Sequence, residues 1–461
     1  MAKFNMAKTK VPMPEQDPKV RNKNFDEVSL GYTLEMAKEE ASRCINCKNQ
    51  PCVSGCPVGV QIPDFIQLIL EDDLDKAYEK IAETNNLPAI CGRVCPQENQ
   101  CEGKCTRGIK DEPVGIGRLE RFVADHRNNK KYNKPVEVTS QGKKVAVVGA
   151  GPSGLSAAAD LAKLGYKVVL FDAFHTAGGV LMYGIPEFRL PKTLVQKELK
   201  NVIGLGVKLQ TNTIVGRTLS LEDLFNQGFE AIYLSTGAGL PRFLNIPGEN
   251  LNGVYSANEF LTRMNLMKAY KFPEYDTPVH IGRKVCVVGG GNVAMDAARS
   301  AKRMGADVTV VYRRSFDEMP ARAEESHHAI EEEINFMNLS NPVEIIGENG
   351  WVKEVKLEKM KLGEADASGR RRPIPTGEYD TVDFDSVIIS IGQSPNPLIK
   401  QTNSDILTED WGGIIIDDTT MTTKDGVFAG GDAVSGAATV ILAMGAGKKA
   451  AKNIDKYLKN K

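Results

Sequence analysis

The sequence of 461 residues has no long hydrophobic run and no excess of charge of either sign. A helix that spans a bilayer needs about 18 or more apolar residues in succession, so we expect no membrane anchor. With 58 basic and 59 acidic residues, no overall field draws the chain to nucleic acid or to an anionic membrane. The N-terminus lacks the apolar segment of a secretory signal, and we therefore predict a cytoplasmic protein. Cysteine is almost absent after residue 105, where Cys286 alone remains.

A glycine-rich turn near residue 150 has the context of a dinucleotide site. Its glycines, between an apolar strand at 145–148 and an alanine-rich helix at 152–164, are Gly149, Gly151 and Gly154. The first permits the tight turn, the second lets the backbone approach a pyrophosphate, and the third allows close helix–strand packing. Asp172 ends the next strand, where a carboxylate can hold a ribose hydroxyl. The alternative is a turn without a ligand, but strand, helix and acid in register favour a nucleotide.

The same pattern recurs about 140 residues later, between a strand at 285–288 and a helix at 292–304. The residues of this second turn that we expect to bind a nucleotide are Gly289, Gly291 and Asn292. The strand that follows ends in Arg313 and Arg314, not in an acid. Guanidinium groups suit a 2′-phosphate, which they grip with paired hydrogen bonds. We therefore predict NADPH here, the alternative being two solvated surface arginines.

A third glycine-rich segment lies near the C-terminus. Gly431 and Asp432 follow an apolar strand, and Thr439 precedes a helix rich in alanine and glycine. This arrangement could bring a carboxylate to a second nucleotide, although it could also be a packing turn. The segment resembles the closing FAD motif of the glutathione-reductase-like flavoproteins, as do Gly179 and residues 183–191 near the flavin. The resemblance implies that the first turn binds FAD and that an inserted domain binds the nicotinamide.

Eight of the nine cysteines lie in two runs before residue 106. The first run has spacings of two, four and three residues and a proline after its last cysteine. It resembles a bacterial ferredoxin run, in which the cysteine before proline ligates the other cluster. Crossed ligation then gives two [4Fe–4S] sites. The first would use Cys44, Cys47, Cys52 and Cys105, and the second Cys56, Cys95, Cys101 and one further residue, for which Cys91 is the obvious thiol. Structural zinc is the alternative, since four-cysteine zinc sites also use short spacings.

These features predict an α/β protein with an N-terminal helical Fe–S domain and a glutathione-reductase-like flavoprotein of two dinucleotide-binding domains. The predicted boundaries are a flexible arm at 1–30, an α-helical domain with two clusters at 31–140, an FAD domain at 141–260 and 388–461, and an inserted NADPH domain at 261–387. Residues 340–390 have β-hairpin character with a turn at 348–350, and Arg370–Arg372 read as a solvated loop.

Three segments extend the resemblance along nearly the whole chain: Leu87–Pro96, Tyr312–Ser315 and Met319–Ala321. They resemble the small (β) subunit of NADPH-dependent glutamate synthase and its relatives. These relatives include the large subunit of NADH-dependent ferredoxin:NADP oxidoreductase and the N-terminal part of dihydropyrimidine dehydrogenase. The resemblance implies that Glu120, in place of Cys91, completes the second cluster.

The implied function is hydride transfer between NADPH and FAD, followed by one-electron steps through two [4Fe–4S] clusters. The cofactors carry this chemistry, and no catalytic side chain is required. The resemblance implies a partner, which is either a glutamate synthase large subunit that makes glutamate from glutamine and 2-oxoglutarate or a ferredoxin-reductase-like small subunit of a bifurcating enzyme. A distant alternative is a zinc-bearing module that senses nucleotides.

Overall fold

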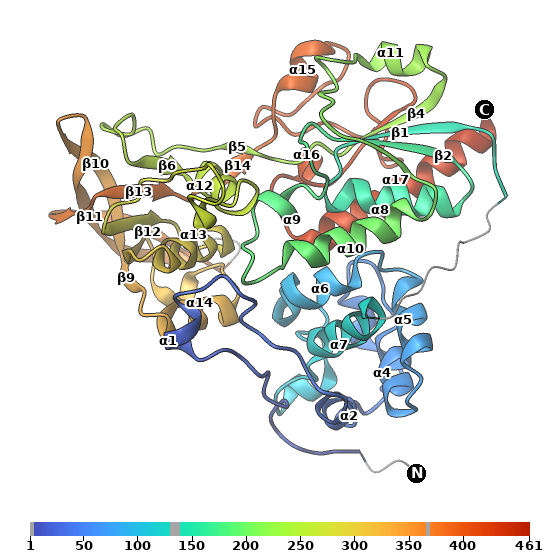
Figure 1. Cartoon of the computed structure of the whole chain (residues 1–461), viewed down its shortest axis with the longest axis horizontal. Coiled ribbons are helices and arrows are strands. Elements are labelled where there is room, and N and C mark those ends of the chain that lie inside the picture. The colour runs from blue at the N-terminus through green and yellow to red at the C-terminus, as the bar shows by residue number, and fades with distance from the viewer. Residues whose placement is uncertain (1–3, 130–138, 366–368) are drawn as a thin grey trace.

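The structure is a computed structural model that describes residues 4–129, 139–365 and 369–461. A helical region lies beneath one of two α/β halves, and the other half stands beside both (Figure 1). We call these three parts the helical domain, the FAD half and the NADPH half, after the predictions above. The main helices of the helical domain are α2 (Leu34–Ala41), α3 (Pro51–Ser54), α4 (Ile62–Leu70), α5 (Leu74–Ala82), α6 (Pro88–Val94) and α7 (Ile116–Asn128).

The FAD half is built on a parallel sheet of five strands in the order β15-β4-β1-β2-β3. The strands are β1 (Lys144–Val148), β2 (Lys167–Phe171), β3 (Lys208–Gln210), β4 (Phe229–Leu234) and β15 (Val427–Ala429), and the main helices are α8 (Pro152–Lys163), α10 (Lys192–Ile203) and α17 (Val440–Asn460). The strands β1 and β4 are almost continuously buried, as expected for a parallel sheet that is covered on both faces. Helices α8 and α17 approach closely, and glycine at position 447 permits this, since a Cβ there would lie 2.2 Å from the Ser153 carbonyl oxygen.

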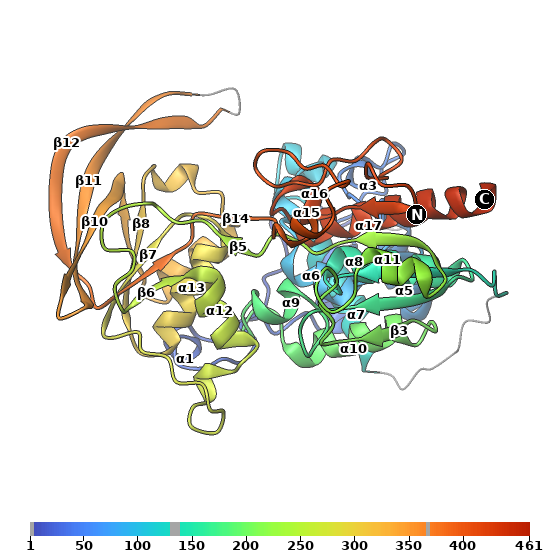
Figure 2. The same cartoon turned by 90° about the horizontal axis from the view of Figure 1, so that it is seen from above.

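The NADPH half contains a second parallel sheet, in the order β6-β13-β7-β8-β9. Its strands are β6 (Val254–Ser256), β7 (Lys284–Val288), β8 (Asp307–Tyr312), β9 (Asn335–Asn338) and β13 (Ser386–Ile389), and its helices are α12 (Ala257–Asn265), α13 (Asn292–Arg303) and α14 (Ala323–Glu331). An antiparallel sheet of β10 (Ser340–Glu348), β11 (Trp351–Ala365) and β12 (Arg371–Asp383) lies on the side away from the FAD half (Figure 2). The predicted turn joins β10 to β11, with Asn349 at φ 53° and Gly350 at φ 82°, which is the conformation of a tight hairpin turn.

The domain boundaries differ from the predicted ones. The chain crosses between the halves at β5 (Leu240–Pro241) and β14 (Gln393–Ser394), which pair as an antiparallel ribbon. Residues 254–260 and 388–389, which we predicted in the FAD domain, therefore belong to the NADPH half. Strand β13 pairs in parallel with β6 and β7. The prediction failed here because a short apolar strand has the same sequence pattern in either sheet.

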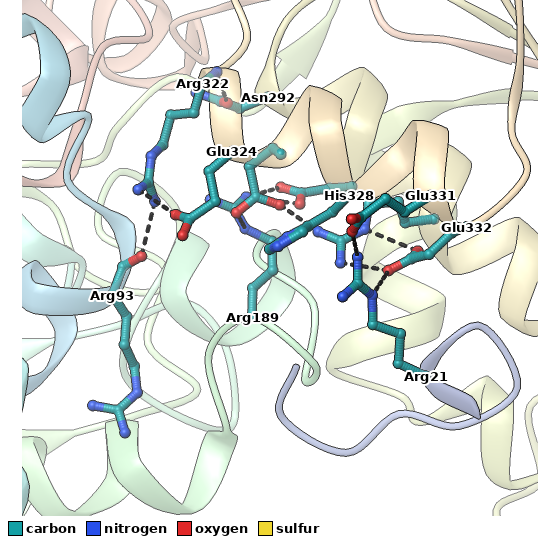
Figure 3. A network of polar contacts seen from close by, with 12 residues as sticks. Arg21, Arg93, Arg189, Asn292, Arg322, Glu324, His328, Glu331 and Glu332 are labelled. Carbon is teal, nitrogen blue, oxygen red and sulfur yellow. Dashed lines mark hydrogen bonds and ion pairs between the residues drawn. The ribbon is translucent and has the colours of Figure 1, made fainter. Parts of the chain in front are cut away.

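The prediction of a flexible arm at residues 1–30 is wrong for its described part, residues 4–30. Val28 is buried, its N–H donates to the Phe188 carbonyl at 2.9 Å, and Phe25 stacks on Tyr270 at 4.1 Å. Arg21 is 1% exposed and forms ion pairs with Glu331 and Glu332 beside α14 (Figure 3). The segment is polar in sequence because its partners are ionic, and polarity alone does not distinguish a solvated arm from one held by ion pairs.

No helix in the described ranges is long and apolar enough to cross a membrane.

Candidate functional site

The structure gathers the first predicted set of thiols in the helical domain. Cys44, Cys47, Cys52 and Cys105 line one cavity, whose other walls include Ile62, Ile66, Val114 and Ile116. Burial raises the pKa of Cys44, and it raises that of Cys52 to about 12. Apolar walls disfavour thiolates, so thiolates in this cavity would need a bound metal to compensate their charge. We call this set the outer cysteine site.

The second predicted set also converges. Burial raises the pKa of the Cys101 thiol, and the neighbouring groups that raise it further include Glu120, Cys95 and Cys56. Burial also raises the pKa of Glu120 to about 7. These four side chains form what we call the inner site. Cys91 lies at its edge, 1% exposed, with its Sγ 3.5 Å from Met444 Sδ and 3.7 Å from Asn85 Oδ1.

The two sites lie at different distances from the FAD half. At the inner site, Cys91 contacts Met444 of α17, and a Cβ at Gly445 would lie 3.2 Å from the Pro57 carbonyl oxygen. Cys91 and Cys95 share a hydrophobic core with the FAD half. The outer thiols Cys44, Cys52 and Cys105 pack instead against a core formed within the helical domain and the N-terminal segment. The inner site therefore lies between the FAD half and the outer site.

The first glycine-rich turn has the expected geometry between β1 and α8. Gly149 adopts φ 101°, and a Cβ at Gly154 would lie 1.8 Å from the Gly149 carbonyl oxygen. At Gly151, which caps α8, a Cβ would meet only the Gly179 Cα, at 3.9 Å. The Asp172 carboxylate accepts hydrogen bonds from the N–H groups of Ala150 at 2.8 Å and Phe174 at 2.9 Å. Burial raises the pKa of Asp172.

Of the remaining FAD-site candidates, Gly179 and Gly431 lie against this turn. Gly431 reaches it because a Cβ there would lie 2.9 Å from the Ser153 Cβ, and Thr439 caps α17. Asp432 begins α16 (Asp432–Ser435), and burial raises its pKa to about 6. Its Oδ1 is buried and accepts no hydrogen bond from the described residues. An orphaned buried acceptor of this kind suits a ligand hydroxyl. Burial and the charges of Asp432 and Asp172 raise the pKa of Tyr183 to about 12, so that phenol lies near both acids.

The second turn has the same form between β7 and α13. Gly289 adopts φ 139°, and a Cβ at Gly291 would have no closer neighbour than Pro320 Cγ, at 4.0 Å. Asn292 begins α13, but its Oδ1 accepts a hydrogen bond from the Arg322 N–H at 2.9 Å (Figure 3). Asn292 thus positions the segment before α14, a role that its sequence did not indicate.

Arginines from two separate segments meet at the end of β8. Arg313 is exposed, and within the described ranges no hydrogen bond or ion pair holds its guanidinium group. Arg314 Nε donates to the Arg371 carbonyl at 2.8 Å, and Arg370 donates to the Tyr312 hydroxyl at 3.0 Å. The segment Arg370–Arg372 is therefore held against β8 and is not a free solvated loop, because β12 begins at Arg371. Sequence reasoning missed this pair because only the path of β12 brings it beside β8.

Two protein-family models match the chain. Residues 21–132 match the 4Fe-4S cluster domain II of dihydropyrimidine dehydrogenase, and residues 143–447 match the pyridine nucleotide-disulphide oxidoreductases. The fold and these matches define the class of protein. It is an oxidoreductase in which a 4Fe-4S domain precedes a flavin- and NADP-binding part.

The chain is 37% identical to the glutamate synthase [NADPH] small chain of Azospirillum brasilense, over 97% of this chain and 95% of that protein. It is 38% identical to the NADP(+)-dependent formate dehydrogenase subunit beta of Moorella thermoacetica, over 89% of this chain and 60% of that protein. Among solved structures it resembles FprA of Mycobacterium tuberculosis in complex with NADPH, with a TM-score of 0.58 at 21% identity, over 69% of this chain and 85% of that one. The chain belongs to the family of NADPH-dependent glutamate synthase small chains, which confirms the resemblance drawn from its sequence.

Proposed function

We propose that this chain is the electron-input subunit of a larger cytoplasmic enzyme, of the glutamate synthase small-subunit type. NADPH would bind at the second glycine-rich turn and FAD at the first, with one [4Fe–4S] cluster at each cysteine site. The proposed acceptor is a partner subunit that makes glutamate from glutamine and 2-oxoglutarate. FAD, when bound, supplies the exchange between two-electron and one-electron chemistry, and the side chains position and tune the cofactors.

The observation that carries this proposal is the spatial order of the sites, which runs from the FAD half to the inner site and then to the outer site. The inner site adjoins α17 of the FAD half through Cys91 and Met444, and the outer site lies beyond it in the helical domain. A protein that only stored metal would need no such series. Sites that follow one another away from a flavin fold suit one-electron transfer toward a partner.

The residues of the FAD half fit a bound flavin nucleotide. A ligand hydroxyl could complete the orphaned Oδ1 of Asp432, and the space at Gly151 admits a pyrophosphate at the start of α8. Asp172 already accepts two backbone N–H groups, so it holds the turn in place as well as offering an acceptor to a ribose.

The arginines at the end of β8 support NADPH over NADH. Arg313 and Arg314 are the predicted pair, and Arg370 and Arg371 add guanidinium groups from the β12 segment. Tyr312 and Glu318 hold the added pair, since Arg371 Nε lies 3.0 Å from Glu318 Oε1. A 2′-phosphate is the part of NADPH that needs such a cluster.

The spacing of the thiols argues against zinc. Four thiolates around one zinc ion, at about 2.3 Å from the metal, lie about 3.8 Å from one another. Among the described residues, the one group of three ligand atoms within 4.8 Å of one another is that of Glu15, Glu324 and His328, which contains no cysteine. No three cysteine Sγ atoms of the described residues lie within that distance of one another, which suits a cluster whose ligands bind separate corners of a cube.

The first test is an anaerobic cofactor count followed by a spectral titration. We expect about eight irons and one FAD per chain, with bleaching by NADPH much faster than by NADH. Zinc in place of iron, or a flavin that NADPH does not reduce, would contradict the proposal. Copurification with a large synthase subunit would identify the partner, whereas a small ferredoxin-reductase-like chain would favour the bifurcating alternative.

A further inference from the structure

Asn85 lies between the two residues that compete to complete the inner site. Its side chain is buried, 1% exposed, in the turn between α5 and α6. Its Nδ2 donates to Glu120 Oε1 at 2.7 Å, and its Oδ1 accepts from the Cys91 thiol at 3.7 Å. One amide group therefore contacts both candidates, one with each end.

The backbone fixes the orientation of this amide. The Leu87 N–H donates to Asn85 Oδ1 at 2.9 Å, so that end of the amide must be the carbonyl oxygen and the other end the NH₂ group. A turned amide would point its donors at the Leu87 N–H, where no acceptor exists. The fold thus presents a donor to Glu120 and an acceptor to Cys91.

The two ends favour different states of the two side chains. An N–H donor stabilises a carboxylate, and it occupies Oε1 only. Within the described part of the chain no hydrogen bond reaches Glu120 Oε2, which is left for a metal. A carbonyl oxygen accepts a bond only from a protonated thiol, whereas iron binds the thiolate.

We propose that Asn85 is a positioning residue that selects Glu120, and excludes Cys91, as the fourth ligand of the inner cluster. The inference rests on the proposed function, because it presumes a cluster at the inner site. Asn85 does not touch the metal but acts through the carboxylate. A hydrogen bond to an anionic ligand also favours the reduced, more negative cluster, so Asn85 raises the reduction potential of the inner cluster.

The test uses the full chain with its clusters, purified anaerobically, as N85L and N85D. Leucine removes both polar contacts at similar size, and aspartate keeps the acceptor but removes the donor. We expect both variants to retain the outer cluster and to show an altered electron paramagnetic resonance signal and a lower midpoint potential for the inner cluster. The matched control is N86A, because Asn86 is the adjacent asparagine and donates instead to Asp160 at 2.8 Å. N86A should leave the inner signal unchanged.

A variant that leaves Asn85 in place guards against misfolding. In C91A the inner cluster should keep its signal, its potential and its iron, because Glu120 is the ligand. A changed inner signal in C91A would overturn the proposal, as would N85L with full iron and an unaltered signal and potential. Both outcomes leave the flavin and the outer cluster in place, whereas a chain without any iron would contradict the proposed function itself.

Discussion

The two nucleotide-binding halves share one backbone device and differ in the side chains around it. At the first glycine of each turn, a Cβ would lie 2.4 Å from a carbonyl oxygen, that of Ser235 in the FAD half and that of Ser390 in the NADPH half. The second strand then ends in the acid Asp172 in one half and in Arg313 and Arg314 in the other. The comparison teaches that the two halves share a backbone and differ in the side chains beside it, and we propose that the backbone holds the phosphates while these side chains select the nucleotide.

The halves also differ in how they hold charge. In the NADPH half the fully buried Glu332 accepts from Arg299 at 2.7 Å and from Arg303 at 2.6 Å. It also accepts from Arg21 at 3.1 Å (Figure 3). In the FAD half the buried Glu198 has, among the described residues, one hydrogen bond, which its Oε1 accepts from Asn128 Nδ2 at 3.1 Å. One half therefore uses ionised carboxylates as structural centres, and the other buries a carboxyl group that forms no ion pair within the described ranges, where burial raises its pKa and the charge of Arg93 partly opposes that rise.

The largest expected effect comes from G154A, because the new Cβ would lie 1.8 Å from a backbone oxygen that cannot move aside. We expect a loss of more than about 3 kcal/mol in the free energy of unfolding and almost no bound flavin. Flavin absorbance per chain and the unfolding midpoint measure both. The matched control is A294G at the equivalent position of the second turn, where alanine is already accommodated. Flavin content near that of the unchanged chain in G154A would contradict the geometry of the first turn.

The next largest effect is expected for E332Q, which removes the charge that three buried arginines share. Breaking a buried pair in this way costs about 3–5 kcal/mol, measured by denaturant unfolding. E331Q serves as the comparison, because Glu331 is 33% exposed and its ion pairs among the described residues are with Arg21 and His327. A partly exposed pair contributes about 1 kcal/mol or less. Equal effects of the two substitutions would show that the buried network has no special weight.

Substitution of the arginines at the end of β8 should weaken NADPH binding in one half without affecting FAD binding in the other. We expect R313A and R314A each to raise the KM for NADPH about 10-fold to 100-fold. This rise corresponds to the loss of charged hydrogen bonds, which contribute about 1.5–3 kcal/mol. The KM for NADH and the flavin content should not change. R283A is the control, since Arg283 is exposed before β7, at the opposite edge of the same sheet. A parallel rise in both KM values would assign these residues to folding and not to the 2′-phosphate.

The smallest effect is a pH dependence of opposite sign in the two halves. Burial raises the pKa of Glu198 to about 7, so its cost to the folded state is present above that pH and disappears as the group is protonated on acidification. Burial opposes the ionisation of Glu325, but Arg189 and Arg299 lower its pKa to about 2. Its contribution is therefore present above the unfolded value of 4.5 and is lost as the pH falls toward 2.

Single-tryptophan variants can follow this difference. W411F leaves Trp351 as the probe of the NADPH half, and W351F leaves Trp411 in the FAD half. Through Glu198, stability should rise as the pH falls from about 7 toward 4.5, and through Glu325 it should fall below about pH 4.5. E198Q should flatten the first trend and E325Q the second. If E198Q and E325Q left the pH profiles of W411F and W351F unchanged, the assignment of these trends to Glu198 and Glu325 would be refuted.

Much of the architecture could be predicted from local patterns. Strand–turn–helix units appear in the sequence because apolar strands, glycines and alanine-rich helices are contiguous, and the structure has them within one residue of the predicted ends at β1, α8, β7 and α13. The sets of converging thiols were also predictable, because a ferredoxin-like spacing already states which cysteine crosses over. The ligand roles of these residues stay predictions.

By itself, the sequence determined the class of protein, the two nucleotide folds and the order of the thiols, since each depends on residues that are close together in the chain. Tertiary structure alone decided that β13 enters the second sheet, that Arg21 is held by ion pairs beside α14, and that Arg370 and Arg371 reach β8. It also decided that Asn85 stands between Glu120 and Cys91. These contacts join segments far apart in the chain through polar groups, and a polar residue in sequence looks the same whether water or a distant partner satisfies it.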